Sequence, residues 1–437
     1  MKKIFALIAA IALASASSQS RCQTTSVLTA TPATLTLAQA EKIALQQNPH
    51  VKIAHLVALA EGQVRREERA ANLPVLTGNL TAVDTHEGDR ITAGGLNNPV
   101  VYQRAAGGVT LSQLMTDFGR THALVSSADF QAKAAASNET ASQDDILLAV
   151  DEAFYHALAS QAILSVAQQT VAARQATADQ VRALTEAKLR SDLDLSFANV
   201  DLQQAKLLLL TATNDSRESL AALNALLGEE NPTLYSLVDD TPTAPAPAPQ
   251  DAAPLLQLAF QSRPDLAALN LQASAAKEFS QAEHDLSRPT ISALGVTGDA
   301  PVRADQITTP WYAAVGVNMS IPIFNGGLIS ARAKEATLRA QAANQNVRQL
   351  RQTIARDVTD TVLEAQSGFQ RIDVSRQLLD QANSAFNLAE TRYKLGLSSI
   401  VELSQAQLAQ TQAQIDYANA RYAYQQTLAA LRFQTSQ

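Results

Sequence analysis

The sequence predicts a mainly α-helical protein with a small β part, built as two tandem copies of one structural unit. Three observations carry this prediction. Aromatic residues make up only 5% of the 437 residues, an internal repeat relates the two halves, and alternating apolar stretches lead into very long helical stretches. Few aromatic residues and much alanine favour long helices packed through small side chains.

The repeat holds at one offset from Gly108, which aligns with Gly316, to Leu223, which aligns with Leu431 (316 − 108 = 431 − 223 = 208). We therefore expect a first repeat at residues 23–228 and a second at 254–437. Residues 229–253 between them are rich in Pro and Ala. Because proline fits neither helices nor inner strands, this segment is expected to be an extended linker.

The first repeat is expected to hold a helix at 35–71, a β-hairpin within about 75–115 (strands 75–83 and 100–113), and a long helical hairpin at about 119–228. Prolines that break helices and open strands, and apolar residues three and four apart, set these bounds.

The second repeat is expected to follow the same order: a helix at 253–286, a β-hairpin at about 290–324, and a helical hairpin at about 327–434. The longer helix of each hairpin has about 69 residues, so it spans roughly 100 Å.

The strand predicted at 311–323 has apolar residues at alternate positions, from Val317 through Met319 to Ile323. Its length suits a tilted membrane strand, and Trp311 at its start suits a membrane interface. A soluble sheet edge is the alternative, but the chain offers little for such a sheet to pack on. Four strands cannot close a barrel, and lipid does not tolerate open edges. Several copies are therefore expected to share one barrel.

The N-terminus predicts a secretory signal peptide with a disordered start at residues 1–22. Lys2 and Lys3 precede an apolar run at 4–13, and small residues at 14–16 suit cleavage. The single cysteine, Cys22, follows polar residues unlike those of a lipoprotein signal, so we expect no acylation.

Several classes of function are disfavoured. The net charge of −7 argues against a nucleic-acid partner. We find no phosphate-binding glycine loop, zinc-protease motif or serine elbow, and so expect no catalytic residue, metal site or cofactor. A periplasmic enzyme is one alternative, but it would lack a site. A secreted coiled-coil scaffold is another, but the strand pairs and Trp311 argue against it.

Two stretches carry a family resemblance: "SIPIFNGGLISAR" at 320–332 and "RYKLGLSSIVELSQAQ" at 392–407. With the tandem organisation, they make the chain similar to the TolC-like outer-membrane efflux and secretion channels (outer-membrane efflux protein family). In the first half, Asp117 and Gly119 match the joint formed by Asn325 and Gly327, whereas Lys188 departs from the family's glycine.

The resemblance implies a homotrimer whose strands form one outer-membrane β-barrel in lipid and whose helices form an α-barrel tunnel through the periplasm. It implies a passive duct for small molecules such as drugs, toxic compounds or metal ions. The partners would be a periplasmic adaptor (membrane fusion) protein and an inner-membrane pump of RND or ABC type. A duct of type I protein secretion is the alternative. The cargo is not named by the sequence.

Both helical turns place an acid three residues after a serine: Asp194 after Ser191, and Glu402 after Ser399. This spacing predicts capping boxes. Carboxylates repeated around a trimer axis would also favour cations. By resemblance, the expected sites are the following: tip and gate, Asp194, Tyr393 and Glu402; adaptor-docking turns, Lys188, Ser191, Gly396 and Ser399; barrel–helix joint, Gly119, Asn325 and Gly327.

Overall fold

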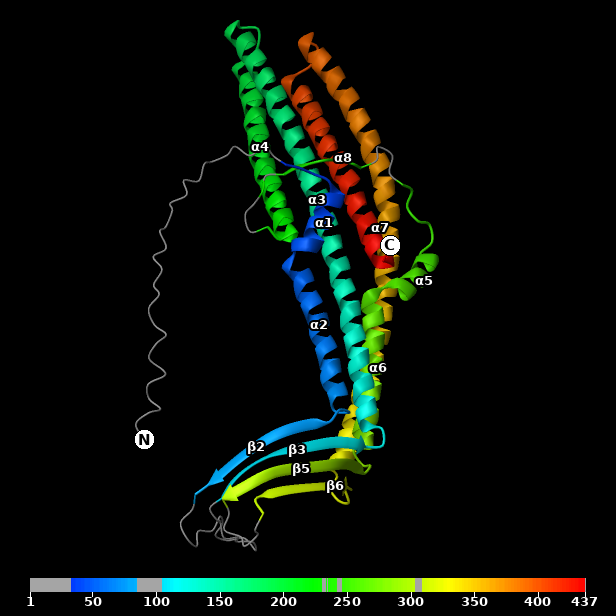
Figure 1. Cartoon of the computed structure of the whole chain (residues 1–437). Coiled ribbons are helices and arrows are strands. Elements are labelled where there is room, and N and C mark those ends of the chain that lie inside the picture. Colours follow the sequence, from blue (N-terminus) through cyan, green and yellow to red (C-terminus); the bar gives the residue numbers. More distant parts are fainter. Residues whose placement is uncertain are drawn as a thin grey trace, which may run out of the picture.

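The structure, a computed structural model, describes residues 33–84, 104–229, 233, 235–241, 246–302 and 309–436. The predicted signal peptide with Cys22, and the start of the strand expected at 100–113, lie outside the described residues. Four strands lie side by side at one end, and long helices run from them to two turns at the other end (Figure 1).

Both halves follow one order of elements, as the repeat predicts. The first half contains β1 (Ala33–Leu35), α1 (Leu37–Gln47), α2 (Pro49–Ala70), β2 (Val75–Val83), β3 (Arg104–Thr116), α3 (Arg120–Glu186) and α4 (Asp192–Leu227). The second contains α5 (Ala253–Ser262), α6 (Pro264–Asp285), β5 (Thr290–Val302), β6 (Trp311–Ser320), α7 (Leu328–Lys394) and α8 (Ile400–Thr435), with β4 (Tyr235–Leu237) between the halves. The mainly α fold with a small β part is thus confirmed.

The first helix of each half is broken, whereas the sequence analysis expected it to be continuous. Residues 35–71 divide into β1, α1 and α2, and residues 253–286 divide into α5 and α6. The breaks fall at Asn48 (ψ 127°) and Arg263 (ψ 120°), which are extended. Each precedes a proline, whose ring excludes the helical conformation from the preceding residue.

The four longer strands form one antiparallel sheet in the order β2-β3-β5-β6. The β3–β5 pairing, with Val109 opposite Thr297, joins the two halves. The β6 strand ends at Ser320, earlier than the expected Ile323, and β5 is longer than expected. Within the described chain, β2 and β6 each leave one edge without a partner strand. Both faces of β6 are exposed.

Tyr312 packs closely over two glycines of the neighbouring strands. A Cβ atom placed on Gly108 or Gly298 would lie 2.5 Å from its hydroxyl oxygen. Glycine is therefore required at both positions, and the aromatic ring covers the backbone that these glycines leave bare.

The joint between sheet and helix uses left-handed backbone in both halves. Gly119 (φ 112°) precedes α3, and Gly327 (φ 85°) precedes α7. Asp117 accepts hydrogen bonds from the amides of Gly119 (3.3 Å) and Thr121 (2.7 Å). Asn325 accepts one from Ile329 N at 3.4 Å. These side chains satisfy donors that the start of a helix leaves unpaired.

The linker is more ordered than the sequence analysis expected. Its β4 strand pairs in parallel with β1. Asp239 accepts hydrogen bonds from Tyr422 Oη (2.9 Å) and Arg421 (3.0 Å) of α8, and Tyr424 Oη donates to Ala246 O at 2.6 Å. The described parts of the linker on either side of residues 242–245 thus contact α8, and we call them the strap. These hydrogen bonds offset the lack of regular backbone pairing there.

The main apolar cluster lies where α1, α3 and α4 meet, and it includes Val150, Phe154 and Leu223. Beyond it, α2, α3, α6 and α7 form a layer in that order, since each contacts the next. Among the described helices, none combines the length and hydropathy of a membrane-spanning helix.

Candidate gate at the helical turns

The two turns have the same backbone form despite their different sequences. Lys188 (φ 57°) and Gly396 (φ 74°) are both left-handed. The next amides, of Leu189 and Leu397, donate to carbonyl oxygens five residues earlier, each at 2.8 Å. This is the hydrogen-bond pattern that commonly ends helices. Lys188, the departure from the family glycine, therefore adopts the glycine's conformation.

The helix after each turn begins with a serine cap, but only one capping box is complete. Ser191 Oγ accepts from Asp194 N (3.2 Å), and the Asp194 carboxylate accepts from Ser191 N (3.3 Å). Ser399 Oγ likewise accepts from Glu402 N at 3.3 Å. The Glu402 carboxylate instead pairs with Arg392 Nε at 3.2 Å. The expected second capping box is therefore wrong in its carboxylate half, because Arg392 offers Glu402 a charged partner.

Tyr393 lies between the two turns and is only 3% exposed. The Arg190 guanidinium stacks over its ring, 4.6 Å from the centroid, and donates to its carbonyl oxygen at 3.2 Å. Its hydroxyl has no hydrogen-bond partner among the described residues. Burial raises the pKa of Tyr393; the Arg190 charge opposes this effect and the Asp194 charge adds to it. The first turn thus holds the end of α7 through Arg190.

The apolar cluster around Tyr393 joins both helical hairpins. Its other buried members come from α3, α4 and α8: Ala178, Val181, Ala198, Leu202, Ile400 and Leu403. The two hairpins are thus packed against each other near their turns.

A buried arginine connects the hairpins farther from the tip. Arg174 of α3 is 7% exposed and lies 3.6 Å from Asp201 Oδ2 of α4. It also donates to Gln407 Oε1 of α8, while Gln407 Nε2 donates to Thr177 Oγ1 at 3.4 Å. Burial lowers the pKa of Arg174, and Asp201 opposes that effect. This node holds three helices together.

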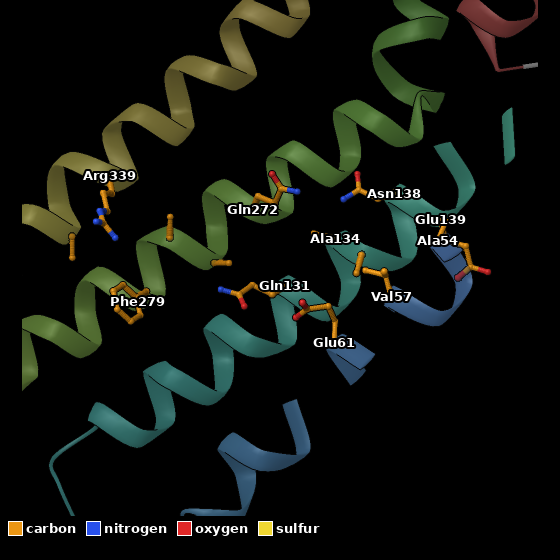
Figure 2. Close-up of a pocket in the computed structure, with 14 residues that line it drawn as sticks. Ala54, Val57, Glu61, Gln131, Ala134, Asn138, Glu139, Gln272, Phe279 and Arg339 are labelled. Atoms are coloured by element: carbon orange, nitrogen blue, oxygen red, sulfur yellow. The ribbon is translucent and has the colours of Figure 1, made fainter. Parts of the chain in front are cut away.

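A groove of about 550 Å³ lies on the layer near the sheet. All four helices contribute to it: Val57 and Glu61 from α2, Gln131 from α3, Gln272 from α6 and Arg339 from α7 (Figure 2). Since both edge helices of the layer reach one groove, the layer is concave on this face.

No group of three or more His, Cys, Asp or Glu side chains in the described residues is placed to hold a metal ion. The chemistry available at the tip is recognition and charge. Asp194 and Glu402 present carboxylates near the ends of the hairpins, while Tyr393, Arg190 and Arg174 hold those ends together.

The sequence analysis missed Arg190, Arg174, Asp201 and Arg392. Arg190 stood inside a turn already singled out, and its contact is with a residue 203 positions away. The one sequence signal for a contact between the two turns was the 208-residue offset, which places them at equivalent positions of the two repeats.

The open sheet, the hundred-ångström helices and the capped turns define a subunit of a helical channel anchored in a membrane. The chain belongs to the outer membrane efflux protein family, whose sequence pattern matches residues 41–229 and 255–435. The predicted resemblance is confirmed. As a member of this family, the protein is located in the outer membrane, from which it extends into the periplasm.

Individual relatives are consistent with this family assignment. Outer membrane protein TolC of Escherichia coli K12 is 23% identical over 439 residues, covering 97% of this chain and 84% of that relative. The solvent efflux pump outer membrane protein SrpC of Pseudomonas putida is 26% identical over 370 residues, covering 83% and 77%. A crystal structure of a membrane protein from Pseudomonas aeruginosa superposes with a TM-score of 0.79 at 21% identity, covering 91% and 93%.

Proposed function

We propose that three copies of this chain form the outer-membrane duct of a tripartite export system for small molecules. A periplasmic adaptor protein would dock at the turns around Lys188, Ser191, Gly396 and Ser399, and an inner-membrane RND or ABC pump would supply the cargo. Relatives such as SrpC, named for solvent efflux, and OpmQ of Pseudomonas aeruginosa, named for pyoverdine export, support a small-molecule cargo. A duct of type I protein secretion is the alternative.

The observation that carries this proposal is the open sheet. Four strands leave two edges unpaired among the described residues, and unpaired edges are costly in lipid. Three copies supply twelve strands, which exceeds the roughly eight of the smallest membrane barrels. The exposed apolar side chains of β6, Val315 among them at 92%, suit a surface that faces lipid.

The concave groove supports a lumen on the same axis. If three curved layers close into a cylinder, their concave faces line its inside. Gln131 and Gln272 would then face the transported molecules. At the far end, Asp194 and Glu402 would surround the entrance, and Tyr393 would help to hold the entrance closed.

Channel recording with single-cysteine variants tests this function. The only cysteine is Cys22, so Cys22→Ser gives a cysteine-free background. In that background Gln272→Cys should conduct in planar bilayers, and a charged thiol-reactive reagent should reduce its single-channel conductance. After chemical cross-linking, the complete cross-linked species should consist of three chains.

The matched control is Lys277→Cys, which is exposed and lies toward the opposite side of α6. Its conductance should not change with the reagent. A protein that inserts and yields no channels would refute the duct. Channels blocked equally at both positions would refute only the placement of the groove in the lumen.

A further inference from the structure

A polar pocket of about 220 Å³ lies where α1, α3 and α8 meet. Glu41 of α1, Asp144 and Asp151 of α3, and Arg432 of α8 line it. Asp151 is 7% exposed, and its Oδ1 has no hydrogen-bond partner among the described residues. A buried carboxylate without a partner is costly, so its presence requires an explanation.

The Glu41 side chain lines the same pocket as Asp151 and acts on its carboxyl group. Two carboxylates cannot bond to each other directly, because neither has a proton to donate. One proton shared between them removes the repulsion and supplies the missing donor. The helix α1 is held against this site, since Ala40 and Ala44 on either side of Glu41 are fully buried.

The second repeat builds the same helices without these acids. At the 208-residue offset, Asp151 corresponds to Thr359 (359 − 151 = 208). Upstream of the first strand the offset is 215, which relates Pro49 to Pro264 (264 − 49 = 215) and Glu41 to Leu256 (256 − 41 = 215). Thr359 is exposed. The helical scaffold therefore does not need a pair of acids here, and the pair is a feature of the first half.

We propose that Asp151 and Glu41 form a proton-binding site that fastens α1 to α3 and α8. With one proton bound, Asp151 and Glu41 hydrogen-bond and Arg432 balances the remaining charge. Without this proton, two negative charges face one arginine, and the charge of Glu152 on α3 adds to the repulsion. The helix α1 is then held less tightly.

The direction of the pH dependence follows. Burial, then the hydrogen bond with Glu41, then the Glu41 charge raise the pKa of Asp151 to about 7. An aspartate in the unfolded chain has a pKa of about 3.9. Between these values the folded state binds more protons, so the stabilisation is complete below about pH 4 and is lost as the pH rises through about 7.

Difference infrared spectroscopy of the full chain in detergent tests the site directly, because only a protonated carboxyl gives its carbonyl band. As the pH is raised, such a band should disappear with a midpoint near pH 7. The spectrum of the Asp151→Asn variant should lack this band. Glu41→Gln removes the neighbouring charge and should lower the midpoint by about one pH unit or more. The control Asp145→Asn, an exposed acid on the same helix, should leave the band unchanged.

Hydrogen exchange tests the consequence for α1. After correction for intrinsic rates, protection of α1 should be several-fold lower at about pH 8 than at about pH 6. In Asp151→Asn, whose amide still donates to Glu41, protection should not depend on pH. The proposal is overturned if no titrating band depends on Asp151 or Glu41, or if α1 loosens equally in wild type and Asp151→Asn.

Discussion

Arg190 shows how a single side chain couples two turns, since it contacts Tyr393, a residue 203 positions away in the sequence. Its guanidinium both stacks on the ring of Tyr393 and donates to that residue's carbonyl oxygen. The Tyr393 hydroxyl contributes no hydrogen bond within the described residues. The contact therefore depends on the arginine and on the aromatic ring, not on the phenol.

Because the contact uses the ring and not the hydroxyl of Tyr393, two substitutions should have different outcomes. Arg190→Leu should raise single-channel conductance or open time in planar bilayers, because it removes a cation–π contact of about 0.5–2 kcal/mol as well as a hydrogen bond. Tyr393→Phe should leave gating close to wild type, because the ring is retained. A strong effect of Tyr393→Phe with none for Arg190→Leu would show that the hydroxyl has a partner in the assembly.

At the scale of elements, the joint between sheet and helix places unequal demands on its residues. Phe118 and Gly326 occupy equivalent positions and have similar φ values of 55° and 63°, so this position accepts a side chain. Gly119 has φ 112°, outside the left-handed region that other residues reach. A Cβ there would lie 3.5 Å from the Asp285 carboxylate, an ordinary contact distance, so the backbone conformation is what requires glycine.

We therefore expect Gly119→Ala to reduce stability by about 1–3 kcal/mol through backbone strain. Gly326→Asn should cost about 1 kcal/mol or less, because asparagine tolerates this conformation and open space surrounds it. Thermal unfolding of the purified assembly measures both. Equal melting temperatures for the two variants would contradict the strain argument.

Helices and their ends were predictable because they depend on local signals. Gly119, Gly327, Ser191 and Ser399 mark these ends in the sequence, and the structure places a helix start beside each. The parallel β1–β4 pair was not predictable, since each strand has three residues and its partner lies about 200 positions away. Arg174 was missed for the same reason: its partners come from other helices, and no local pattern marks them.

At the scale of the whole molecule, the proposed trimer would multiply the charge of the two turns. Asp194 and Glu402 would then give six carboxylates (two in each of three chains), but Arg392 pairs with Glu402 and partly balances its charge. A ring built from these turns would thus be less negative than the acids alone suggest.

Asp194→Asn combined with Glu402→Gln should lower cation preference and divalent block in single-channel recordings, because clustered carboxylates bind divalent cations. Stability should change by about 1 kcal/mol or less. Arg392→Gln should shift selectivity in the opposite direction, toward cations. Unchanged selectivity in both variants would restrict these acids to capping and locate the narrowest point elsewhere.

The pairing of β1 with β4 has a consequence for the order in which the chain folds. These two strands close a loop that contains the whole first repeat, so β1 stays unpaired until about 200 further residues are available. Closing so long a loop costs entropy, though only about 0.6 kcal/mol for each doubling of length. Because folding rates fall as contacts become more distant in sequence, we expect this closure late in folding. The linker that follows β4 contacts Tyr422 and Tyr424 of α8, so its packing requires the last helix of the chain as well.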